Sequence, residues 1–401
     1  MKLLRLKLLR WKSIGLAAPQ IAFVGLLAAL VLSSAPLLAT PGAVTLMRTP
    51  HGGIQPQTVV DHQGVLHLIY FQGDSAHGDI FYVHKKIGTD APFSTPIRVN
   101  STPRSAIAIG TIRGAQLAVG DKGRVHVSWN GVGSKGTNGY ARLYVAYARL
   151  NDVGTAFEPQ RNLLGSTEEV DGGGSVAADV SGHVYVTWHA SARGKDEAAG
   201  GVFLARSPDG GKTFAPGKKI SVLPTGQCGC CSMRAFVDRA GSLYILYRAA
   251  GDNFDRDTTL LVSRDSGTTF RCAILGKWKL GACPMSSFSL AEDNTGVVGA
   301  WETAGQVYHA RLAADVTQVP RSKPAPGMGS RKYPVFIPNA QGDTLFAWVE
   351  GAGWGRGASL VWQVYDKDGN PEGALGRADG VPVWSLVTAV ARPDGSFLVV
   401  Y

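Results

Sequence analysis

Almost no stretch of this 401-residue sequence repeats its apolar residues at the 3.6-residue period of a helix, and no Pro/Ser-rich linker divides it. The first absence argues against a mainly helical fold, because an amphipathic helix has to present apolar residues along one face. The second leaves no obvious point at which to separate domains. The chain has instead 51 glycines and many Val, Thr, Trp and Tyr residues, a composition typical of all-β proteins.

Several motifs that carry chemistry are also missing. The sequence contains no G-x-S-x-G elbow, no H-E-x-x-H pair and no phosphate-binding loop of Walker or dinucleotide form. Its five cysteines show neither the paired C-x-x-C of a structural zinc site nor the C-x-x-C-H of covalent haem. We therefore expect no cofactor and no bound metal.

Positive charge is concentrated at the N-terminus. "MKLLRLKLLRWK" carries five basic residues and no acid, and an uncharged apolar run from Ile14 to Ala39 follows. This pattern predicts that residues 1–39 are an export signal peptide, and an uncleaved N-terminal membrane anchor is the alternative. We expect a secreted or periplasmic protein that meets a membrane only through this segment. Without these five residues the formal net charge falls from +10 to +5, too small an excess to indicate nucleic-acid binding.

A repeat runs through the rest of the chain. Seven segments, such as "AVGDKGRVHVSW", combine a polar turn, a glycine and alternating apolar residues that end in Tyr or Trp. Successive ends are 59, 59, 59, 54, 47 and 53 residues apart. These aromatic ends are Tyr70, Trp129, Trp188, Tyr247, Trp301, Trp348 and Tyr401.

A repeat of this length accommodates about four short antiparallel strands, which predicts a β-propeller with four-stranded blades. We name the strands of a blade A to D from the channel outward, so that each repeated segment is an A–B hairpin. Six units are complete and residues 384–401 form a seventh hairpin, so counting favours seven blades over six. Ala43–Met47 can add an outer strand to that hairpin, and residues 44–401 would form a single domain.

A second motif lies outside the hairpins. Ser207–Phe214 ("SPDGGKTF") and Ser263–Phe270 ("SRDSGTTF") both match S-x-D-x-G-x-T-[WF], and residues 150–157 ("LNDVGTAF") keep Asp152, Gly154 and Phe157. In such a turn the Asp side chain can bond backbone amides while the glycine takes a positive φ. With these motifs the chain resembles the sialidase-like Asp-box, or BNR-repeat, propellers. The resemblance implies that the boxes are C–D turns on the face opposite the active site.

The cysteines belong to the opposite rim. In this strand order the D–A and B–C connections meet at one rim, here called the mouth, where a ligand would bind. Cys228, Cys230 and Cys231 lie on the loop entering the fourth unit, and Cys283 on the loop entering the fifth. In an exported protein such cysteines favour disulfide bonds that fix the mouth, either two bridges among these four with Cys272 free on an outer strand or a scheme that includes Cys272. The alternative is a Cu(I) site, because Met233 and Met285 lie within two residues of the cysteines.

The resemblance also implies candidates for chemistry. Family sialidases hold an anionic sugar with three arginines and use a Tyr activated by a Glu as nucleophile. Tyr333 and Glu302 are the matching catalytic pair, although the early [FY]-R-I-P motif of the family has no copy here. The candidate substrate-binding residues are three arginines just before or at the start of inner strands and one at the end of a B strand: Arg113, Arg234 and Arg331, and Arg248.

These features lead to three functional hypotheses. The first is a sialidase-like propeller that binds a carbohydrate or glycoconjugate at the mouth, with exo-glycosidase activity left open. The second is a non-catalytic propeller whose disulfide-linked mouth binds a protein partner or an envelope component. The third is a Cu(I)-handling Cys/Met site.

Overall fold

The computed structural model describes residues 42–135, 141–166, 168–170 and 172–401. The predicted signal or anchor segment, residues 1–39, lies outside these ranges. Ala39–Tyr401 form one compact unit. Within the described ranges no helix has the length and apolarity needed to cross a membrane.

The unit is a seven-bladed β-propeller, as the repeat predicts. Each of the first six blades contains four antiparallel strands in chain order, and blade three has an additional short strand, β10, on its second strand. Blades one to three are β2 (Ile54–Val60), β3 (Val65–Asp74), β4 (His77–Lys86), β5 (Ile97–Arg98); β6 (Gln116–Val119), β7 (Val125–Lys135), β8 (Ala141–Arg149), β9 (Arg161–Asn162); and β11 (Ser175–Ala178), β12 (Val184–Ala192), β13 (Gly201–Ser207), β14 (Lys218–Lys219), with β10 (Glu168–Glu169).

Blades four to six repeat this order without the additional strand. They are β15 (Arg234–Val237), β16 (Leu243–Arg248), β17 (Thr258–Ser263), β18 (Arg271–Gly276); β19 (Phe288–Asp293), β20 (Gly296–Thr303), β21 (Gln306–Leu312), β22 (Lys323–Pro324); and β23 (Arg331–Pro338), β24 (Thr344–Glu350), β25 (Ala358–Tyr365), β26 (Pro371–Val381).

The seventh blade combines both ends of the described chain. Its hairpin is β27 (Thr388–Ala391) and β28 (Phe397–Val400), and β1 (Val44–Met47) pairs with β28 in parallel, with Val44 opposite Phe397. The prediction that residues near the N-terminus complete the last blade is therefore confirmed. This blade has three strands rather than four.

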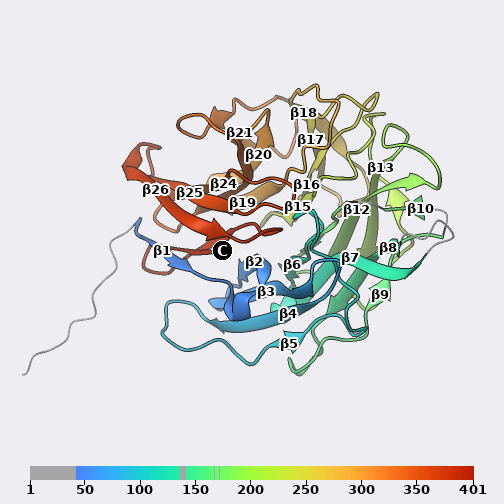
Figure 1. The fold of residues 1–401 in the computed structure, drawn as a ribbon, viewed down its shortest axis with the longest axis horizontal. Coiled ribbons are helices and arrows are strands. Elements are labelled where there is room, and N and C mark those ends of the chain that lie inside the picture. Colours follow the sequence, from blue (N-terminus) through green and yellow to red (C-terminus); the bar gives the residue numbers. More distant parts are fainter. Residues whose placement is uncertain (1–41, 136–140, 167, 171) are drawn as a thin grey trace, which may run out of the picture. The chain divides into compact units, whose positions relative to one another are not determined.

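The seven innermost strands surround a central channel. Each contacts the next in the order β2, β6, β11, β15, β19, β23 and β27, and β27 contacts β2 again. Several of these strands are seen nearest the middle of the ring (Figure 1). Side chains at the start of each inner strand therefore lie at the mouth end of the channel.

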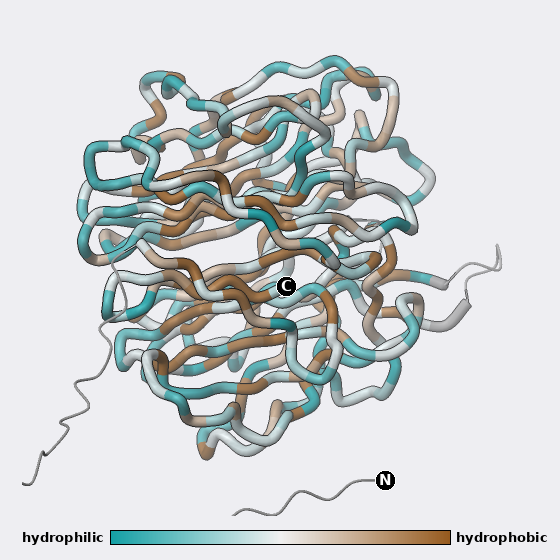
Figure 2. The backbone as a smooth tube through the Cα atoms, turned by 60° about the vertical axis from the view of Figure 1, so that its left-hand side comes forward, coloured by the Kyte–Doolittle hydropathy of each residue, from teal (hydrophilic) through white to brown (hydrophobic). Residues whose placement is uncertain are grey.

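The core lies between blades and is formed largely by second strands. The side chains of three of the repeated aromatic residues are at most 1% exposed: Trp188, Trp301 and Trp348. Hydrophobic segments follow the strands inside the propeller, whereas turns are mostly hydrophilic (Figure 2). The aromatic repeat in the sequence thus serves packing, because a large ring in or directly after each second strand fills the space between neighbouring sheets.

Two C–D turns share one hydrogen-bond pattern. In the turn after β13, Asp209 Oδ1 accepts from the Thr213 amide at 2.9 Å and from the Ser207 hydroxyl at 2.7 Å. In the turn after β17, Asp265 makes the equivalent bonds. Burial works against the charged form of Asp209, but hydrogen bonds from Thr213 and Ser207 outweigh it and lower its pKa to about 2.

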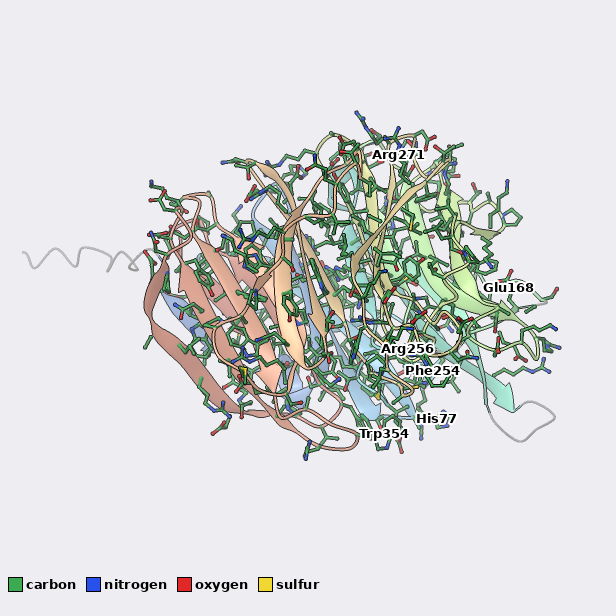
Figure 3. The ribbon with its side chains drawn as sticks, turned by 90° about the horizontal axis from the view of Figure 1, so that it is seen from above. His77, Glu168, Phe254, Arg256, Arg271 and Trp354 are labelled. Carbon is green, nitrogen blue, oxygen red and sulfur yellow. The ribbon has the colours of Figure 1, made fainter. Side chains whose placement is uncertain are left out.

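The two rims of the propeller differ in what they expose. His77, Phe254 and Trp354 lie at B–C connections, and they appear on one side of the blades together with Arg256 (Figure 3). Arg271, which follows a C–D turn, appears on the opposite side (Figure 3). Hydrogen bonds such as Gly229 N to Glu197 Oε1, at 2.8 Å, join D–A loops to B–C loops at the mouth.

Candidate functional site

Three cysteine sulfurs converge at the mouth. The Sγ atom of Cys228 lies 3.3 Å from that of Cys230 and 3.2 Å from that of Cys231, and all three sulfurs lie within 4.8 Å of one another. A disulfide requires about 2.05 Å. All five cysteines are free, and Cys283 is exposed. The predicted disulfide bonds are therefore not confirmed.

Neighbouring loops hold the cysteine loop by its backbone. The Cys228 amide donates to the Arg248 carbonyl at 2.9 Å, and the Gly229 amide donates to Glu197 Oε1. The other oxygen of Glu197 accepts from Arg256 Nη1 at 2.7 Å. Because this ion pair is largely buried, the anchor of the loop is itself fixed.

Arg248 is part of the interior rather than of the open mouth. Its side chain is completely buried and donates to the Arg256 carbonyl, the Thr258 hydroxyl and, at 2.6 Å, the Glu302 carbonyl. Its Nε also donates to Ser286 Oγ, which lies 3.6 Å from Cys231 Sγ. Because its guanidinium is fully buried and hydrogen-bonded inside the protein, Arg248 is not accessible to a ligand at the mouth.

Glu302 and Tyr333, the predicted catalytic pair, are both buried, and Tyr333 lines the channel cavity. Lys332 Nζ lies 3.4 Å from each carboxylate oxygen of Glu302. Burial raises the pKa of Glu302 to about 7, against the opposing charges of Lys332 and Arg248. The hydroxyl of Tyr333 bonds to Thr111 and feels the charge of Glu302, while burial raises its pKa. Glu302 is therefore partnered by Lys332, and the Tyr333 hydroxyl is partnered by Thr111.

Tyr333 reaches the channel through a β-bulge. The pairing of β23 with β24 shifts register between Lys332 and Val335, and Tyr333 takes φ 54°. Blade one has the same feature, because β2 shifts register after Ile54 and Gln55 also takes φ 54°. Positive φ is unusual for residues other than glycine, and such strain concentrates at functional sites.

Arg331 and Arg113 have different surroundings. Arg331 is 3% exposed, pairs with Glu350 at 3.2 Å and lies over the ring of Trp348 at 5.0 Å. Arg113 donates from Nη1 to the Ile109 carbonyl at 3.3 Å. Because Arg331 is bound within blade six, its charge already has a partner.

Arg234 lies in the channel itself. Its Nη1 donates to Gln116 Oε1 at 2.5 Å and to Gln57 Oε1 at 3.2 Å, so two amides from neighbouring inner strands orient it. Burial lowers its pKa to about 10. Among the residues that the structure describes, no carboxylate lies within ion-pair distance of Arg234, so its charge is not neutralised.

Arg234 separates two cavities of different character. The one toward the mouth measures about 70 Å³ and is lined by polar residues such as Gln55 and Ser289 together with apolar ones such as Phe288 and Leu386. The one beyond it measures about 450 Å³ and is lined mainly by the apolar ends of inner strands, such as Val119 and Ala291. An anion arriving from the mouth would therefore meet amides, hydroxyls and one guanidinium.

Sequence reasoning missed three contributors to this region. Gln57 and Gln116 hold Arg234 from inner strands β2 and β6, and the alternation of Gln57 with Gln55 in β2 was the available signal. Lys332 directly precedes Tyr333, yet its pairing with Glu302 joins different blades and leaves no local pattern.

No family model matches this chain, and no curated protein does. Among solved structures, a protein of unknown function from Dyadobacter fermentans matches with a TM-score of 0.54 and 14% identity, over 80% of this chain and 96% of that one. A Trypanosoma rangeli sialidase matches with a TM-score of 0.49 and 12% identity, over 80% and 57%. A Hadza microbial sialidase matches with a TM-score of 0.48 and 13% identity, over 82% and 74%.

The chain thus has an all-β, seven-bladed propeller fold, and its structural neighbours include sialidases. At these identities the likeness is one of fold. Any chemistry has to be argued from the residues of this chain.

Proposed function

We propose that this propeller binds an anionic carbohydrate at its mouth, with the negative group of the ligand held by Arg234. The observation that carries the proposal is the position of this guanidinium, which lines the channel cavity and has no carboxylate partner among the described residues. Arg234 is partly buried, and a charge removed from water is costly unless it is paired. A ligand carboxylate or sulfate would supply the pair and accept two parallel hydrogen bonds from the guanidinium.

The size of the cavity limits what can enter. At about 70 Å³ it is small beside the roughly 300–1,000 Å³ of ordinary ligand pockets. Only the charged group of a ligand would fit beside Arg234, and the remainder would lie among the mouth loops. Trp354 is 65% exposed there and packs edge-on against Trp384 with ring centroids 4.7 Å apart, which offers an apolar wall to a sugar ring.

Sialidase-type hydrolysis is the more specific version of this proposal. It is favoured by the strained backbone of Tyr333 beside the cavity and by Glu302, whose burial-raised pKa of about 7 suits a base at neutral pH. In this version Tyr333 attacks the anomeric carbon while Glu302 accepts its proton, the glycosidic C–O bond breaks, and the departing oxygen takes a proton from solvent. Water then displaces Tyr333 from the sugar, and the tyrosine recovers its proton from Glu302. We also propose an extracytoplasmic location, on the strength of the N-terminal sequence alone.

Calorimetric titration with N-acetylneuraminic acid, glucuronic acid and neutral galactose tests the binding proposal. We expect the acids to bind at least tenfold more tightly than galactose. Arg234→Met should remove this preference, whereas Arg234→Lys should keep part of it, because lysine retains the charge without the planar fork. The control is Arg271→Met, an exposed arginine on the opposite side that should leave affinity unchanged. Equal affinity for acidic and neutral sugars would refute the proposal.

Hydrolysis is tested separately with a fluorogenic sialoside. We expect release of the fluorophore by the wild-type protein and none by Tyr333→Phe, although the variant should still bind the free acid. Binding without release by the wild-type protein would reject the hydrolase version and retain the binding function.

A further inference from the structure

The cysteine cluster is a donor set that the carbohydrate proposal does not use. Within the described ranges, Cys228, Cys230 and Cys231 are the group of His, Cys, Asp or Glu side chains whose donor atoms converge within 4.8 Å. Cys228 and Cys231 are completely buried, and Cys230 is 8% exposed. Three thiols that share a buried space within four consecutive residues offer sulfur and nothing else to an ion.

A methionine adds a fourth sulfur. Met285 packs against the cluster formed by the three cysteines and Ala250. Its backbone takes φ 50°, a conformation that an unbranched L-residue rarely adopts without compensation from its surroundings. Met233 is equally near in sequence, but it belongs to a different hydrophobic cluster around Tyr185 and Tyr247. The fold therefore selects one of the two methionines.

The surroundings of the cluster are positively charged. The buried guanidinium of Arg248 donates from Nε to Ser286 Oγ, which lies 3.6 Å from Cys231 Sγ. Arg256 adds a second buried guanidinium next to the loop. Positive groups at this distance compensate the negative charge that thiolate ligands bring into a buried site.

The type of donor identifies the class of metal. Structural zinc sites are closed by four Cys or His ligands, whereas this cluster has three thiols and a thioether. Thiolate and thioether are the ligands that soft Cu(I) prefers. With a metal–sulfur distance of about 2.3 Å, three sulfurs in trigonal arrangement lie about 4.0 Å apart, so the observed 3.2–3.3 Å requires a small opening of the loop.

We propose that Cys228, Cys230 and Cys231 bind one Cu(I) ion, with Met285 as a weaker fourth ligand. The ion enters past Cys230, the cysteine of the three with the greatest exposure. The site is distinct from the channel: its donors precede Arg234 in the chain and face the next D–A loop. It revises our expectation from the sequence that no metal is bound.

Competition against bathocuproine disulfonate tests this proposal with the full chain, reduced and kept free of oxygen. We expect one Cu(I) per chain to be retained against the chelator, and X-ray absorption at the copper edge should show a first shell of sulfur alone. Retention of no Cu(I), or a clear preference for Zn²⁺ over Cu(I), would overturn the proposal.

Matched variants identify the ligands. Cys231→Ser should abolish retention of the ion. Met285→Leu keeps side-chain volume and should fold, and it should weaken Cu(I) binding at least tenfold without changing the stoichiometry. Met233→Leu and Cys272→Ser are the controls, because both residues lie outside the cluster, and both should bind as the wild-type protein does. Equal losses in Met233→Leu and Met285→Leu would exclude Met285 as a ligand.

Discussion

At the scale of single residues, Glu302 shows how burial and charge compete. Its carboxyl group is 1% exposed and faces Lys332, yet the desolvation cost exceeds the attraction and its pKa is raised. The folded state therefore holds a proton on Glu302 that the unfolded chain, with an ordinary value of 4.5, has already released. Stability from this group is complete below pH 4.5 and is lost as the pH rises through about 7.

Replacing Glu302 with glutamine should remove this dependence. We expect the free energy of unfolding of the wild-type protein to fall between pH 4.5 and about 7, and that of Glu302→Gln to fall less steeply over the same interval. Urea denaturation at a series of pH values measures both slopes. Glu372→Gln, at an exposed carboxylate, is the control and should keep the wild-type slope. Identical slopes in Glu302→Gln and wild type would contradict this reading of Glu302.

The residue scale is also where sequence reasoning reached its limit. The cysteine loop was assigned to the mouth correctly, because the repeat fixes where each inner strand begins. The choice between Met233 and Met285 was not available, since both lie two residues from a cysteine and only packing distinguishes them. Arg331 resembled Arg234 in position, but its ion pair with Glu350 across the hairpin becomes visible only in three dimensions.

At the scale of elements, the C–D turns show that the hydrogen bond that closes a turn can be kept when the residue that makes it changes. The diverged turn at residues 150–157 keeps Asp152, but that carboxylate pairs with Arg124. Asn151 replaces it within the turn, where its Oδ1 accepts from the Thr155 amide at 3.0 Å. The turn thus retains the hydrogen bond that closes it, while Asp152 forms an ion pair with Arg124.

This difference predicts unequal effects of two similar substitutions. Asp209→Ala removes the side-chain bonds to the Thr213 amide and hydroxyl and should destabilise the protein by about 1 kcal/mol. Asp152→Ala should have a smaller effect, because its exposed ion pair lies outside the turn. Thermal unfolding of the two variants compares them directly. A greater loss in Asp152→Ala would show that the turn depends on the Asp position of the motif after all.

The hairpins could be predicted at this scale, but the bulges could not. Each hairpin carries its own turn glycine and apolar alternation, so local sequence is sufficient. The bulges at Gln55 and Tyr333 place residues other than glycine at positive φ, and nothing in the local sequence marks them. They are maintained by contacts from elsewhere, such as the bonds from Gln55 Nε2 to the carbonyls of Ala108 and Trp384.

At the scale of the whole molecule, one short strand closes the ring. β1 covers the open edge of β28, and Val44 and Leu46 pack against the core between blades six and seven. Thr45 points outward and is exposed. An uncovered β28 would present unpaired backbone groups, which are a template for association with another chain.

A charge on the inner face of β1 should therefore open the ring. We expect Leu46→Asp to lower the free energy of unfolding by roughly 2–4 kcal/mol and to promote oligomers at high concentration. Thermal unfolding and size-exclusion chromatography measure the two effects. Thr45→Asp is the matched control and should be close to neutral, since its neighbour Arg392 can pair with the new carboxylate. Equal behaviour of the two variants would show that closure does not depend on this face.

The number of blades was predictable because it is a count of hairpins, and the closing strand because one hairpin lacked an outer partner. The sequence did not predict that the strand completing the seventh blade would run parallel to its partner, because "AVTLM" carries no signal for strand direction. Nor did it predict that this blade would lack a fourth strand.

Closure of the ring by β1 also orders the events of folding. Val44 and Phe397 are paired although 353 positions separate them in the chain. A growing polypeptide can form its first six blades from neighbouring segments, but it cannot seat β1 until the last hairpin has been synthesised. The entropy of bringing such distant segments together makes this pairing a slow step. Until then the blades on either side of the gap stay uncovered, and their exposed apolar surface makes the nascent chain prone to aggregation.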